Sequence, residues 1–557
     1  MSTLRRALRW LQRTSARSLR LSGLLGGALG YSLILSPSIL PRPGFYLGLL
    51  AGLGFTIGYG GGLLVVTMYR ALGFEGPNKL LYRKLRKLVV IAGALMMAAA
   101  TAFSGITQNE IRQLLGQSPE PSSVLLIVAV AAIVATVTMA LSRIIHRMWR
   151  QVSKLLSRWI PRRAANLAGL VLVATVGYWM AAGVAGDALL DAADGIYANT
   201  NDGTAPGVTQ PQLGTRSGSP QSLAPWSTLG LQGRSYVAEG PTAQEISQHT
   251  GAPALEPIRV YAGLQTADSA RERAEIAVAE LERTGAFDRE ILVVAGATGT
   301  GWAEPAQLAA LEYMWNGDTA FATIQYSYLP SWLSFLVDAE RATEAGVELF
   351  EAVHAKWSVL PEDDRPQLIS YGLSLGSFAA QAPFAHASDV VHRADGALYV
   401  GTPNFTPMWQ STTALRDEGS PQWQPQVRQG KTVRFASQVT DLDVPQGQWE
   451  DRRVVYLQHA SDPVVWWSPD LLFSQPDWLA EPAGPDVTAR MRWYPVLTFF
   501  QVTIDQFFGV AAPNGHGHNY SAQTVGAWAA VTQPENWDST ATAELQQLIN
   551  ERYPLES

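Results

Sequence analysis

Five long apolar stretches in the first 190 residues constrain this chain more than any other feature of its sequence. Each has about the 20 residues that a helix needs to cross the hydrocarbon core of a membrane. None contains an internal Lys, Arg, Asp or Glu before Asp187, near the end of the last stretch. A buried helix of a globular domain would rarely recur five times without charge, so we expect an all-α transmembrane bundle of about five spans in residues 1–190. The expected spans are 21–40, 45–67, 88–106, 123–142 and 165–189.

Charge is distributed unequally along the chain. Residues 1–190 contain 21 Lys and Arg but 4 Asp and Glu, whereas the remainder contains 20 and 43. The basic residues alternate with apolar stretches instead of forming one patch, which argues for a membrane partner and against nucleic acid. They concentrate in the N-terminus and in the second and fourth loops, whereas the other two loops have one each, Arg42 and Arg112. Because basic loops stay in the cytoplasm, we expect a multi-pass cell-membrane protein with a cytoplasmic N-terminus and an extracytoplasmic remainder.

Other interpretations of the N-terminal part are weaker. A signal peptide would need an A-x-A-like cleavage site after the first apolar run, and four more apolar stretches follow instead. Glycines such as Gly58, Gly60, Gly61 and Gly62 predict closely packed helices. The absence of cysteine excludes disulfides, Cys-ligated zinc and a thiol nucleophile.

Strand and helix patterns alternate from about residue 258 onwards. Short apolar strands separated by helices are typical of a mostly parallel sheet with helices on both faces. Residues 191–257, rich in Gly, Ser, Thr, Pro and Gln, indicate a linker, within which 226–237 is apolar enough to pack onto the following domain. We expect strands at 258–264, 291–295, 320–326, 367–371 and 453–458, and helices at 267–284, 305–315, 334–357 and 377–387.

A G-x-S-x-G pentad, residues 372–376, follows the expected strand 367–371 directly. A nucleophilic serine needs a sharp turn between a strand and a helix, so that its hydroxyl is exposed. Gly372 and Gly376 would let the chain turn without a Cβ clash. Because a helix is expected to follow at once, we assign the nucleophile to Ser374 rather than to a structural turn.

An acid is expected after a late strand, where it would orient the catalytic histidine and stabilise its imidazolium form. Asp462 follows the expected strand 453–458 and is our first choice. Asp443 and Asp395 are the alternatives, and each of the three has the ordinary interpretation of a solvated loop acid or a helix cap.

The catalytic base is expected in the loop 513–520, between an apolar helix expected at 495–508 and a terminal helix expected at 521–531. His518 and His516 both lie there, in a chain with eight histidines. We favour His518 and keep His516 as the alternative. A metal site is a weaker interpretation, because no carboxylate accompanies the two histidines at ligand spacing; we expect neither metal nor cofactor.

The glycine-rich loop 296–301 follows an early strand, where an oxyanion hole would be built. Backbone N–H donors are needed from that loop and from the residue after the nucleophile. We therefore expect Leu375 to act with Ala297 or Thr298. A phosphate cradle is excluded by pattern, because the loop has neither Gly-Lys-Ser/Thr nor G-x-G-x-x-G.

Residues 403–449 are irregular and rich in Pro, Gln and Trp, which suggests an insertion that acts as a lid. Trp409, Trp466 and Trp467 lie near the expected mouth of the site. Such aromatic residues more often pack in the core than line a substrate pocket.

These motifs together resemble those of the membrane-bound α/β-hydrolase family, a bacterial and mainly actinobacterial group with an N-terminal multi-span domain. The resemblance rests on the pentad 372–376, on Ser461-Asp462-Pro463 and on residues 515–520. It covers nearly the whole chain. It implies an α/β-hydrolase fold in residues 258–557 and a triad of Ser374, Asp462 and one of the two histidines, His516 or His518.

The resemblance and the triad predict a serine esterase that forms an acyl-enzyme. The topology suggests an ester of a lipid or of an acylated envelope component as substrate. An acyltransferase with the same triad and a non-catalytic membrane protein with a hydrolase-like binding domain are the alternatives.

Overall fold

The structure is a computed structural model that describes residues 20–74, 79–179, 197, 199–330, 333–334 and 339–554. The chain forms two compact units. The helical unit comprises residues 1–186 together with Pro469–Phe508, and the sheet unit comprises Asp187–Ser468 together with Gly509–Ser557. The segment Pro469–Phe508 therefore interrupts the sheet unit in sequence and belongs to the helical unit.

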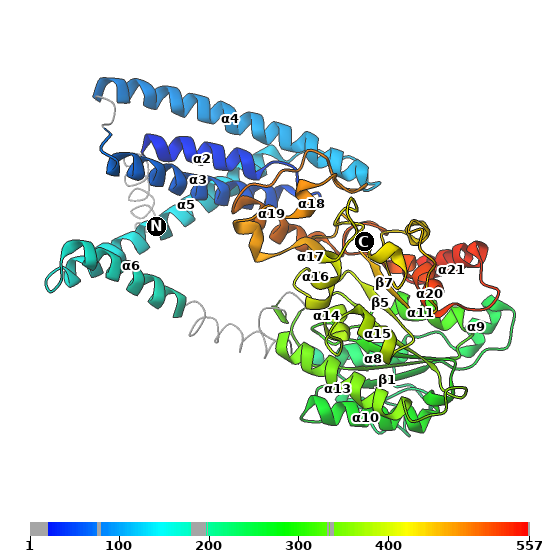
Figure 1. The fold of residues 1–557 in the computed structure, drawn as a ribbon. Coiled ribbons are helices and arrows are strands. Elements are labelled where there is room, and N and C mark those ends of the chain that lie inside the picture. Colours follow the sequence, from blue (N-terminus) through cyan, green and yellow to red (C-terminus); the bar gives the residue numbers. More distant parts are fainter. Residues whose placement is uncertain are drawn as a thin grey trace. The chain divides into compact units, whose positions relative to one another are not determined.

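A seven-stranded parallel sheet forms the centre of the sheet unit (Figure 1). The strand order is β1-β3-β2-β4-β5-β7-β6, so β4 lies in the middle. Nearly every strand residue is buried, as expected where helices cover both faces of a parallel sheet. The strands are β1 Ile258–Ala262, β2 Ile291–Gly296, β3 Thr319–Ile324, β4 Gln367–Leu373, β5 Gly396–Val400, β6 Val433–Ala436 and β7 Arg453–Leu457.

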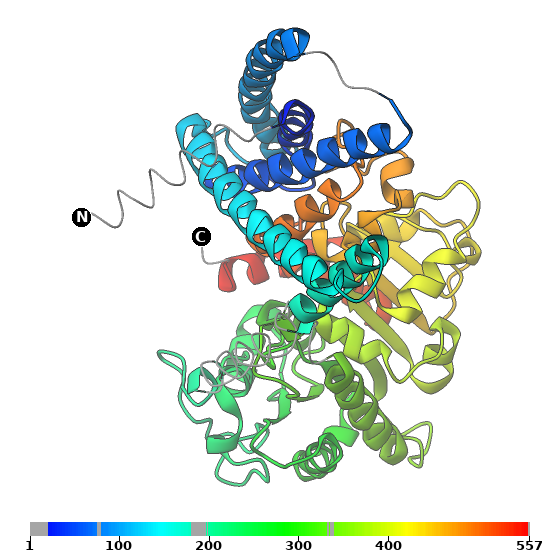
Figure 2. The same ribbon diagram turned by 90° about the vertical axis from the view of Figure 1, so that its left-hand side faces the viewer.

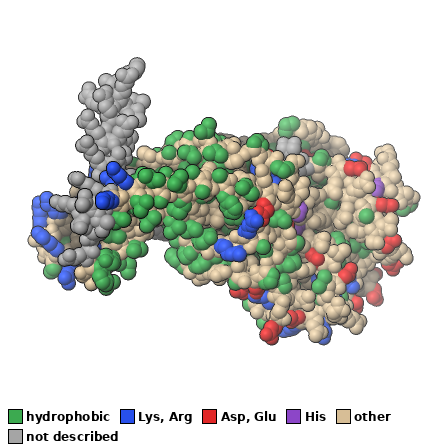
Figure 3. Space-filling view, turned by 90° about the horizontal axis from the view of Figure 1, so that it is seen from above, with side chains coloured by type: hydrophobic (Ala, Val, Ile, Leu, Met, Phe, Trp, Pro, Cys, Tyr) green, Lys and Arg blue, Asp and Glu red, His purple; other side chains and the backbone are tan. Residues whose placement is uncertain are grey.

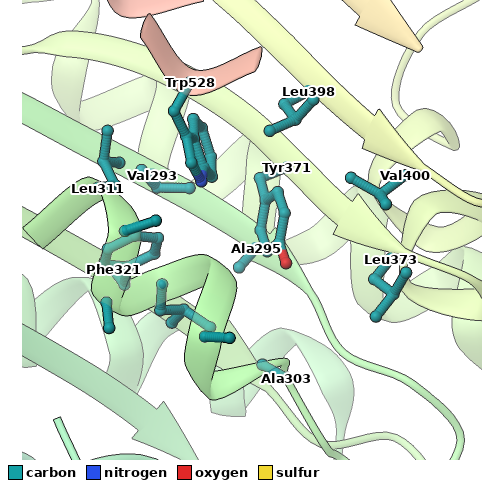
Figure 4. Packing of buried hydrophobic residues seen from close by; sticks show 14 of the residues in the cluster. Val293, Ala295, Ala303, Leu311, Phe321, Tyr371, Leu373, Leu398, Val400 and Trp528 are labelled. Carbon is teal, nitrogen blue, oxygen red and sulfur yellow. The ribbon is translucent and has the colours of Figure 1, made fainter. Parts of the chain in front are cut away.

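Two groups of helices cover the faces of the sheet, as the alternating pattern predicts. One group is α10 (Ala270–Thr284), α13 (Ala339–Trp357) and α14 (Leu375–Gln381), and the other is α11 (Pro305–Met314), α20 (Thr524–Thr532) and α21 (Ser539–Arg552). The second group encloses the core drawn in Figure 4, where Trp528 packs on Tyr371 of the central strand with ring centroids 5.1 Å apart. The Trp528 indole N–H donates to the carbonyl of Gln307 at 2.8 Å, so its polar atom is satisfied in this core.

The stretch 191–257 is not the structureless linker that its composition suggests. It contains α8 (Gly230–Ala238) and α9 (Ala243–Thr250), and Leu229, Val237 and Ile246 are buried in the sheet unit's core. Arg259 of β1 joins the two parts, because it pairs with Glu312 at 2.7 Å and donates to the carbonyl of Tyr236 at 2.8 Å. The expectation that 226–237 packs onto the domain agrees with this arrangement.

The region 403–449 also differs from the expected lid. It contains α16 (Pro407–Ala414) and the short strand β6, which hydrogen-bonds to β7 at the edge of the sheet. Part of this region is therefore a component of the sheet, and the longest departure of the chain from the sheet unit is Pro469–Phe508 instead.

The helical unit contains three helices that are long and apolar enough to cross a membrane among the described residues, not the five that we predicted. They are α3 (Gly44–Ala71), residues 84–114 of α4 (Lys79–Leu114) and α5 (Val124–Leu156). Helix α2 (Leu21–Ile34) has 14 residues, about 21 Å at 1.5 Å per residue, because Pro37, Pro41 and Pro43 follow it. Helix α6 (Arg162–Tyr178) has 17 residues, and the rest of the predicted span lies outside the described residues.

Glycines bring α2 and α3 into backbone contact. A Cβ added at Gly58 would lie 2.1 Å from the carbonyl oxygen of Gly26, and one added at Gly30 would lie 2.2 Å from that of Gly54. Gly60, by contrast, has nothing within 4 Å of such an atom. Of the four glycines from which we expected close packing, Gly58 and Gly62 therefore approach α2, whereas Gly60 and Gly61 do not.

The ends of the long helices differ in charge. Helices α3 and α5 start at the same end of the helical unit, because Gly44 and Gly48 pack against Ser123 and Val130. Helix α4 runs the opposite way, because Gly105 near its C-terminal end packs against Ser122, just before α5. The other ends of the three helices carry the basic residues, which are Arg70, Lys84, Arg86, Lys87, Arg143, Arg147, Arg150 and Lys154. Exposed apolar side chains cover the helices between the two ends, and Figure 3 shows them in green with Lys and Arg gathered in blue beyond them. A soluble surface would not expose so much apolar area, so this unit is suited to a membrane.

The segment Pro469–Phe508 packs on the helical unit at the end with few basic residues. Its main helix, α19 (Leu497–Asp505), contacts α2 and α3, and Figures 1 and 2 both show the orange segment beside these blue helices. Leu497 joins Ile34 and Leu50 in a buried apolar cluster. At the end of α4, Glu110 accepts a hydrogen bond from Thr488 at 3.1 Å and forms an ion pair with Arg490 at 2.9 Å.

Candidate active site

The pentad 372–376 forms a sharp turn between β4 and α14. Ser374 is the residue at the turn, with φ 56° and ψ −127°, a strained conformation for a residue with a side chain. Its backbone N–H donates to the carbonyl of Val400 at the end of β5, at 2.9 Å. The serine is partly exposed, whereas Leu373 and Leu375 on either side are buried. This is the geometry expected of a nucleophile elbow.

The glycines of the pentad permit a very close approach to the end of β2. A Cβ added at Gly376 would lie 2.3 Å from the carbonyl oxygen of Gly296, and one added at Gly296 would lie 2.1 Å from that of Gly376. A Cβ added at Gly372 would lie 2.3 Å from the same Gly376 oxygen. Because each contact is with backbone, no side chain can be accommodated, and the loop after β2 is held against the elbow.

Asp462 is fully buried after β7, at the same carboxyl edge of the sheet as the elbow. The local sequence explains its position, since Asp is a good helix cap and Pro463 is favoured at the first helical position of α17 (Pro463–Trp466). Its Oδ1 accepts the backbone N–H of Val464 at 2.8 Å. Its Oδ2 accepts from His518 Nδ1 at 2.7 Å and from the Tyr520 hydroxyl at 2.6 Å.

The structure brings His518, rather than His516, to Asp462. Its ring packs over Gly401, where an added Cβ would lie 2.6 Å from His518 Cε1, and Gly401 has the positive φ of 52° that favours glycine. Gly401 directly follows Val400, the residue whose carbonyl accepts the Ser374 N–H, so His518 lies beside the elbow. Among the described residues, no atom hydrogen-bonds His518 Nε2, which is buried. Ser374 Oγ therefore does not hydrogen-bond to Nε2 here, and such bonds in ligand-free sites often form only with substrate.

Tyr520 and His459 support this pair, and sequence reasoning gave neither a role. The Tyr520 hydroxyl accepts the backbone N–H of His459 at 3.1 Å while it donates to Asp462, and the two rings stack with centroids 4.1 Å apart. The Gly517 N–H donates to Ser461 Oγ at 2.8 Å, and the Gly517 carbonyl lies 2.8 Å from His459 Nδ1. These contacts join the loop of Asp462 to the loop of His518.

The comparison with known families agrees with this geometry. The family model described as the Alpha/beta-hydrolase family matches residues 258–545, more than half of the chain. The chain belongs to this family. A second model, described as the N-terminus of the same family, matches residues 35–241. No curated protein and no solved structure matches the chain.

In this α/β-hydrolase, the N-terminal family match extends beyond the membrane-suited helices. It includes residues 213–241, part of the stretch that packs on β1 of the sheet unit. Family membership supports a hydrolase-like function.

The alternative acids lie in other environments. Asp395 precedes β5, where it accepts the backbone N–H of Leu368 at 2.9 Å and pairs with Arg452 at 3.1 Å, so it lies at the amino ends of the strands. Asp443 is exposed at the end of a short 3₁₀ helix, Val439–Asp443. His516 is partly buried in the turn before His518 and has its N–H bound to the carbonyl of Pro513.

The loop after β2 offers backbone donors beside the elbow. Leu375 is the first residue of α14, where helix N–H groups have no partner within the helix. The Thr298 N–H is already used, because it donates to the carbonyl of Trp302 at 3.0 Å, which favours Ala297 over Thr298 as second donor. Tyr261 and Gln325 hold this loop through the carbonyls of Gly301 and Thr300, both at 2.9 Å.

An acid with a perturbed pKa follows this loop. Glu304 caps α11 by accepting the N–H of Ala306 at 3.4 Å, and burial raises the pKa of its carboxyl to about 7. The carboxyl is thus partly protonated near neutral pH.

Two of the three tryptophans near the expected mouth pack in the core. Trp409 and Trp466 are each 1 % exposed and meet edge to face. Their indole N–H groups are satisfied, Trp409 by Gln458 and Trp466 by the carbonyl of Ala460. These two side chains therefore pack beneath the loops and do not line an open pocket, whereas Trp467 is partly exposed.

Proposed function

We propose that this protein is a membrane-anchored serine hydrolase that works through an acyl-enzyme on Ser374. The observation that carries the proposal is the buried Asp462–His518 hydrogen bond of 2.7 Å beside a strained serine elbow. A histidine oriented by a buried carboxylate through Nδ1 has Nε2 available to take a proton. The unpartnered Nε2 of His518 is in that state.

The chemistry follows from these positions. His518 Nε2 takes the Ser374 hydroxyl proton as the serine oxygen attacks an acyl carbonyl carbon. The backbone N–H groups of Leu375 and Ala297 stabilise the oxyanion, and Asp462 stabilises the imidazolium. When the tetrahedral intermediate collapses, the leaving alcohol receives the proton from His518. Water, deprotonated by the same histidine, then attacks the acyl-enzyme and releases the acid.

Charge and packing within the helical unit support an extracytoplasmic catalytic domain. The basic residues lie at one end of α3, α4 and α5, and such ends stay in the cytoplasm. The segment Pro469–Phe508 packs at the other end, and both of its ends continue into the sheet unit. An enzyme at the outer membrane surface would meet esters of lipids or of acylated envelope components, which we propose as its substrate class.

The first test is labelling of the purified full-length protein in detergent with a fluorophosphonate probe. We expect wild type to be labelled, Ser374→Ala to be unlabelled, and His518→Ala to be labelled far more slowly than His516→Ala. Absence of labelling in folded wild type would refute the hydrolase assignment. Equal labelling of the two histidine variants would refute the role of His518.

The same acyl-enzyme would also support acyl transfer. Hydrolysis of a p-nitrophenyl ester in the presence of an added alcohol distinguishes the two outcomes. Release of free acid alone supports the hydrolase. A ratio of acylated alcohol to free acid that exceeds the molar ratio of alcohol to water supports a transferase.

A further inference from the structure

The segment Pro469–Phe508 departs and returns at the two loops that carry the acid and the base. It departs after α17, the helix that Asp462 caps, and it returns at Gly509, before the loop of His518. The chain thus enters the helical unit between the two members of one hydrogen-bonded pair. No other part of the sheet unit's sequence is interrupted in this way among the described residues.

The return point contacts the base loop directly. The carbonyl of Gly509 accepts the backbone N–H of His518 at 2.8 Å. The carbonyl of Ala512 accepts a hydrogen bond from the Asn519 side chain at 2.9 Å. A Cβ added at Gly517 would lie 2.6 Å from the Cβ of Ala512. The position of residues 509–512 therefore determines the position of the His518 backbone.

The departure point contacts the acid loop in the same way. Trp466, at the end of α17, donates its indole N–H to the carbonyl of Ala460 at 2.8 Å. Asp462 in turn holds the start of α17 through the N–H of Val464. A shift of α17 would therefore move the acid.

Within the helical unit the segment is fixed by a buried ion pair. Arg42, in the loop between α2 and α3, contacts both carboxylate oxygens of Asp505, with Nε–Oδ1 at 2.6 Å and Nη2–Oδ2 at 3.1 Å. Ser38 and the backbone N–H of Ile39 donate to the same carboxylate. Both charged side chains are fully buried. A buried bidentate ion pair tolerates little displacement of either side chain, because any shift leaves a buried charge without its partner.

The fixed part of the segment extends to its last residue. The ring of Phe508 packs edge to face on Tyr46 of α3, with centroids 4.8 Å apart. Phe508 is bonded to Gly509, whose carbonyl holds the His518 N–H. One peptide bond therefore separates a residue held by the helical unit from a residue that holds the base.

We propose that Pro469–Phe508 is a tether through which the helical unit positions the catalytic acid and base, with Arg42 and Asp505 as its positioning residues. The catalytic part of this statement rests on the proposed function. Loss of the Arg42–Asp505 pair releases the tether, loosens residues 459–466 and 509–520, and weakens the hydrogen bond between Asp462 and His518. Loss of activity then follows from misplacement of the base, without any change at Ser374.

The test compares Asp505→Asn with Glu120→Gln in the full-length protein in lipid nanodiscs. Both variants neutralise one carboxylate of an arginine pair in the helical unit, but Glu120 pairs with Arg112 and, in the part of the chain that the structure describes, has no hydrogen bond or ion pair with the tether. One readout is the rate of fluorophosphonate labelling at Ser374 with its pH profile. The other is deuterium uptake of peptides covering 459–466, 509–520 and, as reference, α10.

We expect Asp505→Asn to lower the labelling rate by about 10- to 100-fold, the loss typical of a misplaced catalytic group, and to shift the limb of the pH profile set by the base. Deuterium uptake should rise in 459–466 and 509–520 but not in α10, and Glu120→Gln should resemble wild type. Unchanged labelling and unchanged uptake in Asp505→Asn would overturn the proposal. A uniform rise in uptake that includes α10 would also overturn it, because it indicates general destabilisation.

A second variant covers the case in which Asp505→Asn does not fold. Phe508→Ala removes the contact with Tyr46 without burying a charge, and it should give the same local pattern of uptake with a smaller loss of labelling. If folded wild type is not labelled, the hydrolase assignment fails, whereas the uptake data still decide whether the tether holds the two loops.

Discussion

Asp462→Asn is the most informative single substitution at the candidate site. The carboxylate accepts three hydrogen bonds, one from the backbone N–H of Val464 and two from the side chains of His518 and Tyr520. The amide of asparagine has one oxygen, so its NH₂ group must face either the Val464 N–H or the side chains of His518 and Tyr520. The Val464 N–H is a fixed donor, whereas a histidine can change tautomer and a hydroxyl can rotate. The amide oxygen therefore turns to Val464, and its NH₂ group faces His518 Nδ1.

The consequence is a histidine with its proton on the wrong nitrogen. When Nδ1 accepts from the amide, Nε2 carries the proton and cannot take one from Ser374. A change of this kind in a serine-histidine-aspartate triad lowers turnover by about 10⁴-fold, which corresponds to about 5.5 kcal/mol of lost transition-state stabilisation. Protein stability should change little, because the cap of α17 is kept and no charge remains buried.

The assay is the second-order rate constant of fluorophosphonate labelling at pH 7, with thermal unfolding followed by tryptophan fluorescence. Asp443→Asn is the matched control, because the same change at an exposed loop acid should leave the rate at its wild-type value. A labelling rate for folded Asp462→Asn within tenfold of wild type would refute the reasoning, and loss of labelling in Asp443→Asn would move the acid to that residue.

Three further predictions concern other parts of the molecule. Gly401→Ala forces a side chain to a φ of 52° and to 2.6 Å from His518, so labelling should fall about 100-fold; a rate equal to wild type would show that the base lies elsewhere. Glu304→Gln should be more stable than wild type, and the difference in unfolding free energy should grow to at most about 3 kcal/mol as pH rises from 4.5 through 7, because the carboxyl of unfolded wild type ionises at lower pH than that of the folded protein. Thermal unfolding of both proteins at pH 5 and pH 8 measures this difference, and a difference that does not change with pH would contradict the raised pKa of Glu304. In the helical unit, Gly58→Ala should lower the unfolding temperature in detergent because the new Cβ overlaps a carbonyl, whereas Gly60→Ala should leave it unchanged or raise it slightly; equal effects would contradict the packing of α2 on α3.

Sequence alone predicted the elements that local pattern determines. The strands expected at 258–264, 291–295, 320–326, 367–371 and 453–458 correspond to β1, β2, β3, β4 and β7 within a few residues. Each is a short apolar run bounded by turn residues, so it needs no knowledge of its neighbours. The elbow at Ser374 was predicted for the same reason, because two glycines and a strand-to-helix change are adjacent in sequence.

Other features were missed because their signals are weak or distant. The short strands β5 and β6 lie in regions without clear alternation, and their places beside β4 and β7 come from pairing. The stretch 191–257 has the composition of a linker, but Arg259 and a few buried apolar residues hold it to β1. Three prolines after Ile34 end α2 early. The number of apolar residues in 21–40, on which the predicted span rested, does not reveal this effect.

The tertiary structure alone decided how distant loops meet. Sequence placed two histidines in one loop and three acids in others, and only folding showed that His518 is the one that contacts Asp462, 56 positions away. Tyr520, His459 and Gly401 gained their roles at the same junction. Sequence also assigned residues 495–508 to the catalytic domain, whereas the structure places them in the helical unit through Arg42 and Asp505. The physical reason is common to both cases: local pattern reports what a residue's neighbours in sequence dictate, but hydrogen bonds and ion pairs between remote segments depend on which surfaces the packed core brings together.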